Sequence, residues 1–270
     1  MLAPKLGIVA GGGTLPALLA KACFESNREF FLLAIDGFTD FAMIKEFPHA
    51  WIGLGEGGKG IEILAEQSVK EVVFAGPVRR PSLKEVKLDS WSIRFFTKLG
   101  KAWIGDDSLL SAIVSSLEQE GFKVIGPDKL LTDHISVLGV YGQTSPNENA
   151  LEDIQRGFNV LKQIGDLDIG QAVIVQHGVI LGIEGAEGTD QLMTRCAHLH
   201  REGVGGVLVK GRKPGQEDRI DLPAIGLQTI QIAAKCKLQG IAIEAGGVFI
   251  FERHKMIGLA DESDLFVIGV

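Results

Sequence analysis

The sequence lacks paired cysteines and long apolar runs, and each of these absences excludes a class of protein. Its three cysteines, Cys23, Cys196 and Cys236, stand far apart without a CxxC pair, so neither a disulfide framework nor a zinc knuckle is indicated. No apolar run approaches the roughly 18 residues of a membrane span, and Gly11–Gly13 interrupts the N-terminus too early for a signal peptide. We therefore expect a soluble, cytoplasmic protein whose cysteines are small core side chains.

An excess of positive charge and the common hydrolase motifs are also missing. Lys and Arg number 27 against 34 Asp and Glu, a net charge of −7, which argues against broad nucleic-acid binding. There is no GxSxG elbow, and the histidines form no triad pattern, with His177 in a predicted turn and His198 and His200 near a helix end. The chain does contain 46% hydrophobic residues and 35 glycines. The glycines follow apolar runs, which predicts tight turns between strands and helices.

Apolar runs recur through the first half with helical patterns between most of them, which predicts a parallel sheet. The expected strands lie near residues 7, 32, 51, 73 and 123. The predicted fold class is therefore α/β with two domains. They are a Rossmann-like α/β domain over 1–130, a linker over 131–138 and an α+β domain over 139–270. An amphipathic helix is expected over 83–99, with Trp91, Phe95 and Phe96 as core or domain contact.

Glycines at the start of the chain predict an anion site. Gly11, Gly12, Gly13 and Thr14 join a strand to a helix, where free backbone N–H groups and the helix dipole point at one spot. The dinucleotide fingerprint fails there because Pro16 takes its third glycine position. A second stretch, 53–60, loosely fits both that fingerprint and the start of a P-loop. Arg79, in a basic loop after the strand near 73, either contacts phosphate or is solvated.

A predicted hairpin in the second half leads into an acidic loop. Residues 172–175 and 179–181 are its strands, and Glu184, Glu187 and Asp190 follow within seven residues. Three carboxylates interleaved with glycine suit a hard cation such as Mg²⁺. The alternative is a solvated loop that caps the next helix through Thr189 or Asp190.

Two further charged residues, Lys210 and Asp221, lie beside apolar runs, so we expect their tips at a cavity. Asp221 is either a cap for the helix that begins at Leu227, or a metal ligand or general base. Cleavage of a pyrophosphate would use such a set. A cation neutralises the phosphate oxygens, and a carboxylate orients the attacking water.

Several segments, in this order and spacing, resemble the LpxI-type UDP-2,3-diacylglucosamine pyrophosphatases of lipid A biosynthesis over nearly the whole chain. They are G-I-V-A-G-G-G-T-L-P (7–16), A-G-P-V-R-R-P (75–81), G-D-D-S-L-L (105–110), E-G-F-K-V-I-G (120–126), V-I-L-G-I-E-G-A-E-G-T-D (179–190), G-V-L-V-K (206–210), K-P-G-Q (213–216), R-I-D-L-P-A-I-G (219–226) and I-A-I-E-A-G-G (241–247). The departures are small, with His177 standing where the family usually has Gln.

The resemblance implies a Mg²⁺-dependent hydrolase with a substrate cleft between its two domains. It would release UMP and 2,3-diacylglucosamine 1-phosphate, with water attacking the phosphorus on the sugar side. The family's functional aspartate, in its D-L-P segment, corresponds to Asp221, and Lys210 would neutralise phosphate charge. Glu184, Glu187 and Asp190 would join Asp221 at the metal. The expected substrate contacts are Gly11, Gly12, Gly13, Thr14, Arg79, Gln176 and Thr189.

The substrate implied is a UDP-linked, diacylated glucosamine, so transient contact with the inner-membrane surface is expected, and no nucleic acid. A homodimer is left open. Two other function classes also remain open at this point. One is a nicotinamide oxidoreductase that uses the glycine loops, and the other is a non-catalytic module that binds a nucleotide sugar or acyl chains.

Overall fold

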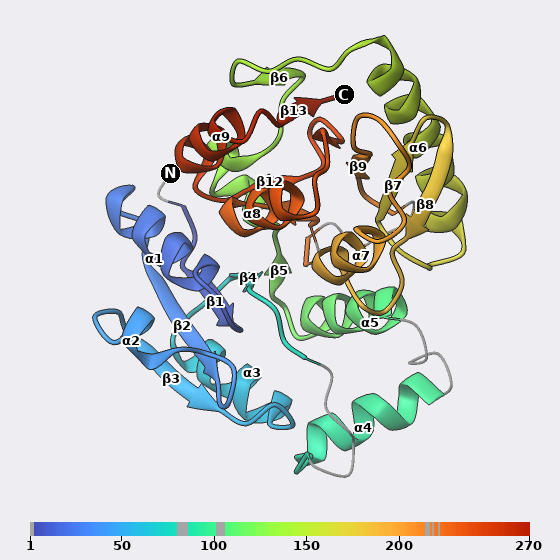
Figure 1. Ribbon diagram of the computed structural model, residues 1–270. Coiled ribbons are helices and arrows are strands. Elements are labelled where there is room, and N and C mark those ends of the chain that lie inside the picture. Colours follow the sequence, from blue (N-terminus) through green and yellow to red (C-terminus); the bar gives the residue numbers. More distant parts are fainter. Residues whose placement is uncertain (1–2, 80–85, 101–105, 214–216, 218, 221) are drawn as a thin grey trace. The chain divides into compact units, whose positions relative to one another are not determined.

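The computed structural model describes residues 3–79, 86–100, 106–213, 217, 219–220 and 222–270 (Figure 1). The chain divides into two compact units, Met1–Thr132 with Glu217–Asp221, and Asp133–Gln216 with Leu222–Val270. Each unit contains a mixed set of helices and strands around its own sheet. The predicted two-domain α/β fold class is confirmed.

The first unit has its strands where the apolar runs predicted them. In chain order its elements are β1 (Leu6–Ala10), α1 (Leu15–Glu25), β2 (Phe30–Ile35), α2 (Phe41–Ile44), β3 (His49–Ile52), α3 (Gly57–Glu66), β4 (Glu71–Ala75), α4 (Ser90–Leu99), α5 (Asp106–Gln119), β5 (Lys123–Val124) and the short 3-10 helix η2 (Pro127–Lys129).

All five strands of this unit are parallel, in the order β3-β2-β1-β4-β5. Parallel strands need a crossover on each connection, and their near-continuous apolar runs fit a sheet that is covered on both faces. Helices α3 and α5 supply Leu64, Val114 and Leu117 to a cluster with Leu33 and Val72 of the sheet. Helix α1 packs against β1, β2 and β4.

Helix α4 differs from its prediction. It begins at Ser90, and residues 86–89 are not helical, while 83–85 lie outside the described residues. The start is fixed by Asp89, whose carboxylate accepts a hydrogen bond from Ser92 N at 2.7 Å and so caps the helix. Its aromatic side chains were expected to be core or domain contact. They are not core, because none of them is fully buried, and a domain contact stays a prediction.

The second unit is built on a six-stranded sheet. In chain order its elements are η3 (Thr132–His134), β6 (Gly139–Tyr141), α6 (Glu148–Asp166), β7 (Ala172–Gln176), β8 (Val179–Ile183), α7 (Thr189–Cys196), β9 (Val207–Lys210), β10 (Ala224–Ile225), α8 (Leu227–Lys235), β11 (Gly240–Ile243), β12 (Phe249–Ile250), α9 (Arg253–Glu262) and β13 (Phe266–Gly269).

The sheet order is β6-β13-β11-β9-β7-β8, in which β13, β11 and β9 are parallel and β6 and β7 run against their neighbours. Helix α6 covers one face, where Ile154 and Leu161 meet Val173 and Val209. Helices α7, α8 and α9 cover the other, within a cluster that includes Leu192. Figure 1 shows these layers.

Three features of this unit did not follow from the sequence patterns. Helix α7 ends at Cys196, before His198 and His200, which were expected near a helix end. Neither strand β6 nor helix α9 was predicted. The sequence did not predict α9 because only Met256 and Ala260 of its ten residues are buried. Two buried positions are too few to give a clear helical period.

The predicted hairpin is confirmed as β7 and β8, paired antiparallel. Its turn residues His177 and Gly178 have φ angles of 50° and 72°, and positive φ at both positions is the type I′ geometry that matches the twist of the strands. Asp153 of α6, 1% exposed, accepts hydrogen bonds from His177 N at 2.9 Å and Gly178 N at 2.6 Å. The turn is therefore anchored on the helix beneath it.

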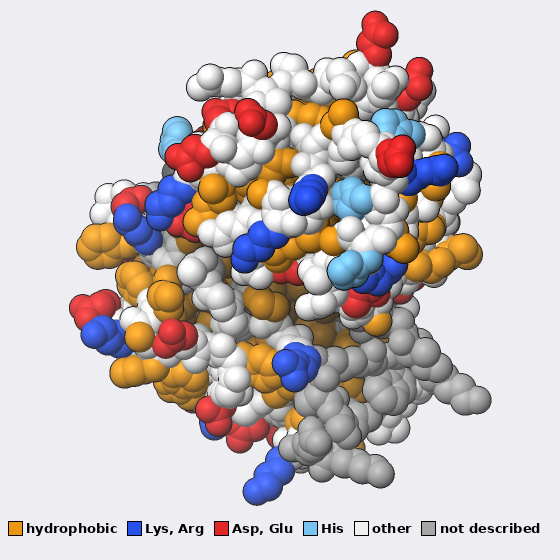
Figure 2. Space-filling view, viewed as in Figure 1, with side chains coloured by type: hydrophobic (Ala, Val, Ile, Leu, Met, Phe, Trp, Pro, Cys, Tyr) orange, Lys and Arg blue, Asp and Glu red, His pale blue; other side chains and the backbone are white. Residues whose placement is uncertain are grey.

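Within the part of the chain that the structure describes, no helix is both long and apolar enough to cross a bilayer. Figure 2 shows acidic, basic and apolar side chains interspersed over the face that it draws.

Candidate functional site

The glycine loop of the first unit lies at the point where the strand order reverses. The chain leaves β1 for β2 and β3 on one side and returns to β4 on the other, so the loops after β1 and β4 meet at the carboxyl edge. Ligands of open α/β sheets bind at such a point. The structure therefore brings residues 11–14 together with the loop that carries Arg79.

Close packing of these two loops explains the first two glycines. Gly11 N donates to Ala75 O at 2.7 Å and Gly12 N to Pro77 O at 2.9 Å, and a Cβ on Gly11 would lie 2.6 Å from Gly76 O. The N–H groups of Gly11 and Gly12 are thus used within the fold. Any anion at this loop would be held by the residues that follow them.

Gly13 and Thr14 are exposed at the start of α1. Their N–H groups have no hydrogen-bond partner in the described chain, and Thr14 is the N-cap without a side-chain cap bond. Such a helix start can accept a phosphate oxygen. Arg79 is also exposed, at the last described position of the β4 loop.

The N–H groups in the second glycine stretch, residues 53–60, bind side chains of the protein itself. Asp89 accepts hydrogen bonds from Gly58 N at 2.7 Å and Lys59 N at 3.2 Å, and Ser92 Oγ accepts from Gly57 N at 3.1 Å. The carboxylate of Asp89 thus sits where a phosphate would sit at the start of α3. The P-loop and dinucleotide interpretations of residues 53–60 are therefore not supported.

In the second unit, three buried polar side chains meet at the carboxyl end of β9. Lys210 Nζ donates to Thr189 Oγ1 at 2.9 Å, and Thr189 Oγ1 donates to Glu184 Oε1, also at 2.9 Å. The lysine also donates to Ala224 O at 2.9 Å. Each of the three side chains is at most 8% exposed. A charged side chain is tolerated in such a buried position only when it has hydrogen-bond or ion-pair partners.

The sheet topology explains why these residues meet. Strand β8 runs parallel to β9, so Glu184 after β8 and Lys210 at the end of β9 reach the same edge. Gln171, which precedes the antiparallel β7, donates from its N–H to Glu184 Oε2 at 3.1 Å. Thr189 is the first residue of α7 and completes the group. The structure thus brings Glu184, Thr189 and Lys210 together, and the roles expected of them stay predictions.

The other two predicted metal carboxylates have different partners. Glu187 Oε1 accepts from Arg195 Nη2 at 2.7 Å and Nε at 3.0 Å, and the hydrogen bonds from Arg195 hold the pKa of Glu187 below its ordinary value. Asp190 Oδ2 accepts from Gln228 Nε2 at 2.8 Å. The three carboxylates of the acidic loop therefore have three separate sets of contacts.

The predicted metal set is not assembled by the carboxylates that are described. No group of three or more His, Cys, Asp or Glu residues stands ready for a metal ion among residues 3–79, 86–100, 106–213, 217, 219–220 and 222–270. Among the predicted ligands that the structure describes, Glu184 is the one linked to Lys210, through Thr189. Asp221, on which the metal and catalytic predictions centre, lies outside the described residues.

Gln176, a predicted substrate contact, is 0% exposed and fully engaged within the fold. Its Nε2 donates to Arg201 O at 3.0 Å and Val204 O at 2.8 Å, while its Oε1 accepts from Arg201 N at 2.9 Å. These bonds hold the loop after α7 and account for a buried amide without a ligand. Its contact with substrate stays a prediction.

Sequence reasoning missed Glu244, which follows β11 at the same edge of the sheet. Its Oε1 accepts from Arg212 Nη2 at 2.7 Å, and its Oε2 accepts from Arg212 N at 2.7 Å. Gln171 was missed as well, and its buried Oε1 has no hydrogen-bond partner. A usable signal existed for Glu244, because an acidic residue directly after a buried parallel strand lies at the edge where ligands bind.

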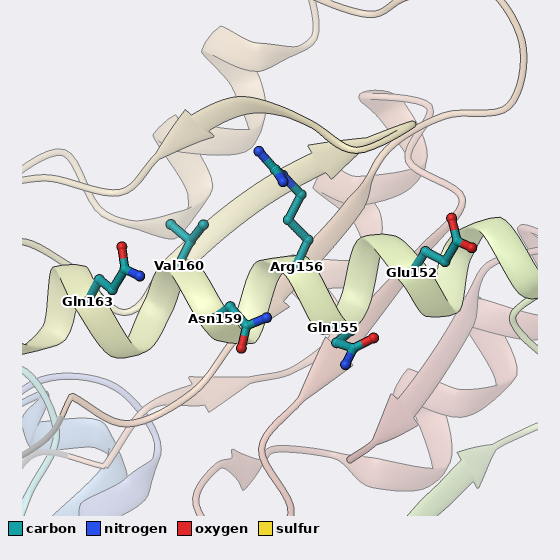
Figure 3. Close-up of a pocket in the computed structure, with 6 residues that line it drawn as sticks. All are labelled: Glu152, Gln155, Arg156, Asn159, Val160 and Gln163. Carbon is teal, nitrogen blue, oxygen red and sulfur yellow. The ribbon is translucent and has the colours of Figure 1, made fainter.

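A surface hollow elsewhere on this unit does not compete with the site. It follows the outer side of α6, and Figure 3 shows its lining side chains spreading away from one another along a single helix. The lining residues are Glu152, Gln155, Arg156, Asn159, Val160 and Gln163. None of them is buried, so the hollow offers no converging polar groups.

Comparison with known proteins identifies both halves of the chain. The family models of the LpxI N-terminal domain and the LpxI C-terminal domain match residues 5–134 and 138–268. The UDP-2,3-diacylglucosamine pyrophosphatase LpxI of Caulobacter vibrioides is 38% identical over 273 residues, covering 98% of this chain and 97% of that protein.

Among solved structures, the N5-carboxyaminoimidazole synthase of Aspergillus clavatus, in complex with ADP and 5-aminoimidazole ribonucleotide, is 11% identical. It covers 73% of this chain and 44% of its own, with a TM-score of 0.26, which is too low to indicate a shared fold. The family matches instead span both units in order, and the chain belongs to the LpxI family.

Proposed function

We propose that this protein hydrolyses the pyrophosphate bond of UDP-2,3-diacylglucosamine, a step of lipid A biosynthesis. The products are UMP and 2,3-diacylglucosamine 1-phosphate. The observation that carries the proposal is the 38% identity to the Caulobacter vibrioides pyrophosphatase over 98% of the chain. This similarity extends through both family domains.

In this proposal the positive charge of Lys210 lies beneath the reacting phosphate. Negative charge grows on the phosphate oxygens as water attacks, and a fixed cation in a water-poor site stabilises that charge strongly. The Thr189 hydroxyl holds the ammonium in place and is itself oriented by Glu184. Asp221 orients the attacking water and accepts its proton.

The open start of α1 binds the nucleotide part of the substrate in the same proposal. Gly13 and Thr14 offer exposed N–H groups at the positive end of the helix dipole. Arg79 follows the neighbouring strand at the same edge of the sheet and adds a guanidinium for phosphate.

We further propose Mg²⁺ as the cofactor, held by Asp221 together with Glu184. When bound, the ion would draw charge from the phosphate oxygens. Glu187 and Asp190 are the further ligands of this proposal. As with Glu184, which accepts from Thr189 and Gln171, each already has a partner, Arg195 or Gln228, that the ion would displace. Titration of the protein with Mg²⁺ alone should give binding heat that Asp221→Asn and Glu184→Gln each reduce, and EDTA should abolish turnover until Mg²⁺ is restored.

The test of the function is UMP release from UDP-2,3-diacylglucosamine dispersed in detergent micelles. We expect turnover by the full chain and a loss of at least about 100-fold in Asp221→Asn and Lys210→Ala. Lys235→Ala, an exposed lysine on α8, is the matched control and should keep full activity. No UMP from the unaltered chain would refute the function, whereas full activity of Asp221→Asn would refute only its role.

A further inference from the structure

Helix α4 presents an apolar stripe, formed by the exposed Ile93 and the half-buried Phe96, that the described part of its unit does not fully bury, whereas Trp91 and Phe95 are half-buried beside it. Trp91 and Phe95 stack with ring centroids 5.5 Å apart, and Phe96 meets Phe95 edge-on at 5.2 Å. Ile93 is 52% exposed. Of the ten residues of α4, all described, the one buried residue is Ser92, which is the reverse of a helix that packs on a core.

The side of this helix that carries Trp91 is basic. Arg94 and Lys98 are exposed, and residues 90–99 contain no acidic side chain. At 100° per residue these two cations lie 40° apart, on the side away from Phe96. The whole chain carries a net charge of −7, so α4 is positive locally in an acidic protein.

The first turn of α4 holds it to the unit. Asp89 and Ser92 accept hydrogen bonds from the start of α3, and Trp91 Nε1 donates to Glu120 Oε1 at 2.9 Å. Beyond this turn the helix runs outward at the border of the first unit (Figure 1). Its position is thus fixed by polar bonds while its apolar stripe is left for another contact.

We propose that α4 lies in the surface of an anionic phospholipid bilayer. Ile93 and Phe96 enter the boundary between headgroups and acyl chains, and Arg94 and Lys98 meet lipid phosphates. Aromatic residues beside exposed cations on one helix are typical of interfacial binding. The bilayer is preferred to a second protein because two cations on an acidic chain complement anionic lipid but not another copy of that chain. The proposal rests on the proposed function in one respect, since a diacylated substrate resides in a bilayer.

The test is flotation of the full chain with vesicles that contain no substrate. Vesicles of phosphatidylethanolamine with phosphatidylglycerol should carry the protein, and vesicles of phosphatidylcholine alone should carry much less. Arg94→Gln with Lys98→Gln should lower the partition coefficient about 10- to 30-fold, because each cation near an anionic surface contributes roughly fivefold. Ile93→Ser should lower it about tenfold on both kinds of vesicle.

Helix α1 of the same unit supplies matched controls. Phe24 is 72% exposed there and the Lys21 side chain 69% exposed, so Phe24→Ser and Lys21→Gln remove an exposed aromatic and a cation outside α4. Both controls should float as the unaltered chain does. Unchanged flotation of the α4 variants, or equal loss in the α1 controls, would overturn the proposal. So would concentration-dependent dimers in sedimentation that the α4 variants abolish, because a second copy would then cover the stripe.

Turnover separates this proposal from the proposed function. With substrate in anionic vesicles, the α4 variants should show a raised KM, and with substrate in detergent micelles they should match the unaltered chain. If the unaltered chain floats but releases no UMP in micelles, the function fails and the surface stands. If it releases UMP but α4 variants work equally well on vesicles, the surface fails and the function stands.

Discussion

At the scale of single residues, Thr189 links the two charged side chains of the site in the second unit. Its hydroxyl accepts from Lys210 Nζ and donates to Glu184 Oε1. A hydroxyl can do both at once, whereas a carboxylate placed there could only accept and an amide could not replace it in shape. Lys210 and Glu184 are therefore held together through one small side chain, and both lose a partner when it is removed.

Replacing Thr189 by valine keeps the volume and removes the hydroxyl. We expect Thr189→Val to destabilise the protein by about 1–3 kcal/mol, because a buried lysine and a buried carboxylate each lose a hydrogen bond. UMP release should fall with it. Urea unfolding gives the first quantity and the micelle assay the second. Thr189→Ser retains the hydroxyl and should recover most of both, and a serine variant as impaired as the valine variant would argue against the hydroxyl.

The second residue-scale prediction concerns Asp153, which anchors the hairpin turn. Asp153→Ala leaves His177 N and Gly178 N without their acceptor, and we expect a loss of about 2–4 kcal/mol in the free energy of unfolding. Urea unfolding measures this loss. Glu152→Ala changes the exposed neighbour on the same helix and should cost less than about 0.5 kcal/mol. Equal effects of the two substitutions would mean that the turn does not depend on the carboxylate.

At the scale of elements, the sequence predicted what depends on local patterns. The five strands of the first sheet are apolar runs bounded by glycine and polar residues, and all five are present. The start of α4 depended instead on Asp89, whose role as a cap shared with α3 joins positions about thirty residues apart. The glycines of 53–60 matched nucleotide-binding patterns for the same reason. The carboxylate that their N–H groups bind belongs to Asp89, about thirty residues further along the chain.

The candidate site divides in the same way. Glu184 and Lys210 could be found from the sequence, since a charged residue directly after an apolar run lies at the end of a strand. That Glu187 would pair with Arg195 could not be found, because the partner lies a helix turn and a half into α7 and its direction depends on the fold. The burial of Gln176 among backbone groups of residues 201–204 could likewise not be predicted, because it depends on the tertiary structure.

Glu71 links three strands at the amino edge of the first sheet. This link predicts how the stability of the protein depends on pH. Its carboxylate at the start of β4 bonds Arg28 Nη2 at 2.6 Å, just before β2, and Lys123 Nζ at 2.8 Å, at the start of β5. Burial alone would raise the pKa of Glu71, but the hydrogen bonds from Lys123 and Arg28 outweigh it and lower the pKa below 4.5.

A pKa lowered by folding contributes stability that is present above the unfolded value and is lost as the pH falls through the folded one. The unaltered chain should therefore be more stable than Glu71→Gln at neutral pH, and the difference should shrink as the pH drops below 4.5. Urea midpoints of both proteins across this range measure it. Glu25→Gln, whose ion pair with Lys21 is mostly exposed, should show little pH-dependent difference.

At the scale of the whole molecule, the chain returns once to its first unit. Segment Glu217–Asp221 groups with Met1–Thr132, although the residues on both sides of it belong to the second unit. Ile220 packs against the cluster that includes Leu117 and Val124. Arg219 donates to Glu217 Oε1 at 2.7 Å and to Glu118 Oε1 at 2.7 Å, and the hydrogen bonds to Glu217 and, less, to Glu118 raise the pKa of Arg219.

The last prediction follows from this return, because Asp221 is the next residue after Ile220. Ile220→Ser removes the apolar contact that holds the segment, and we expect trypsin to cleave after Arg219 about tenfold faster in native conditions, since the segment opens more often. UMP release in micelles should fall in the same variant if Asp221 acts in catalysis. Ile220→Val keeps most of the contact and should change neither rate. Faster cleavage with full activity would separate the segment from the reaction, and unchanged cleavage would show that Ile220 does not hold it.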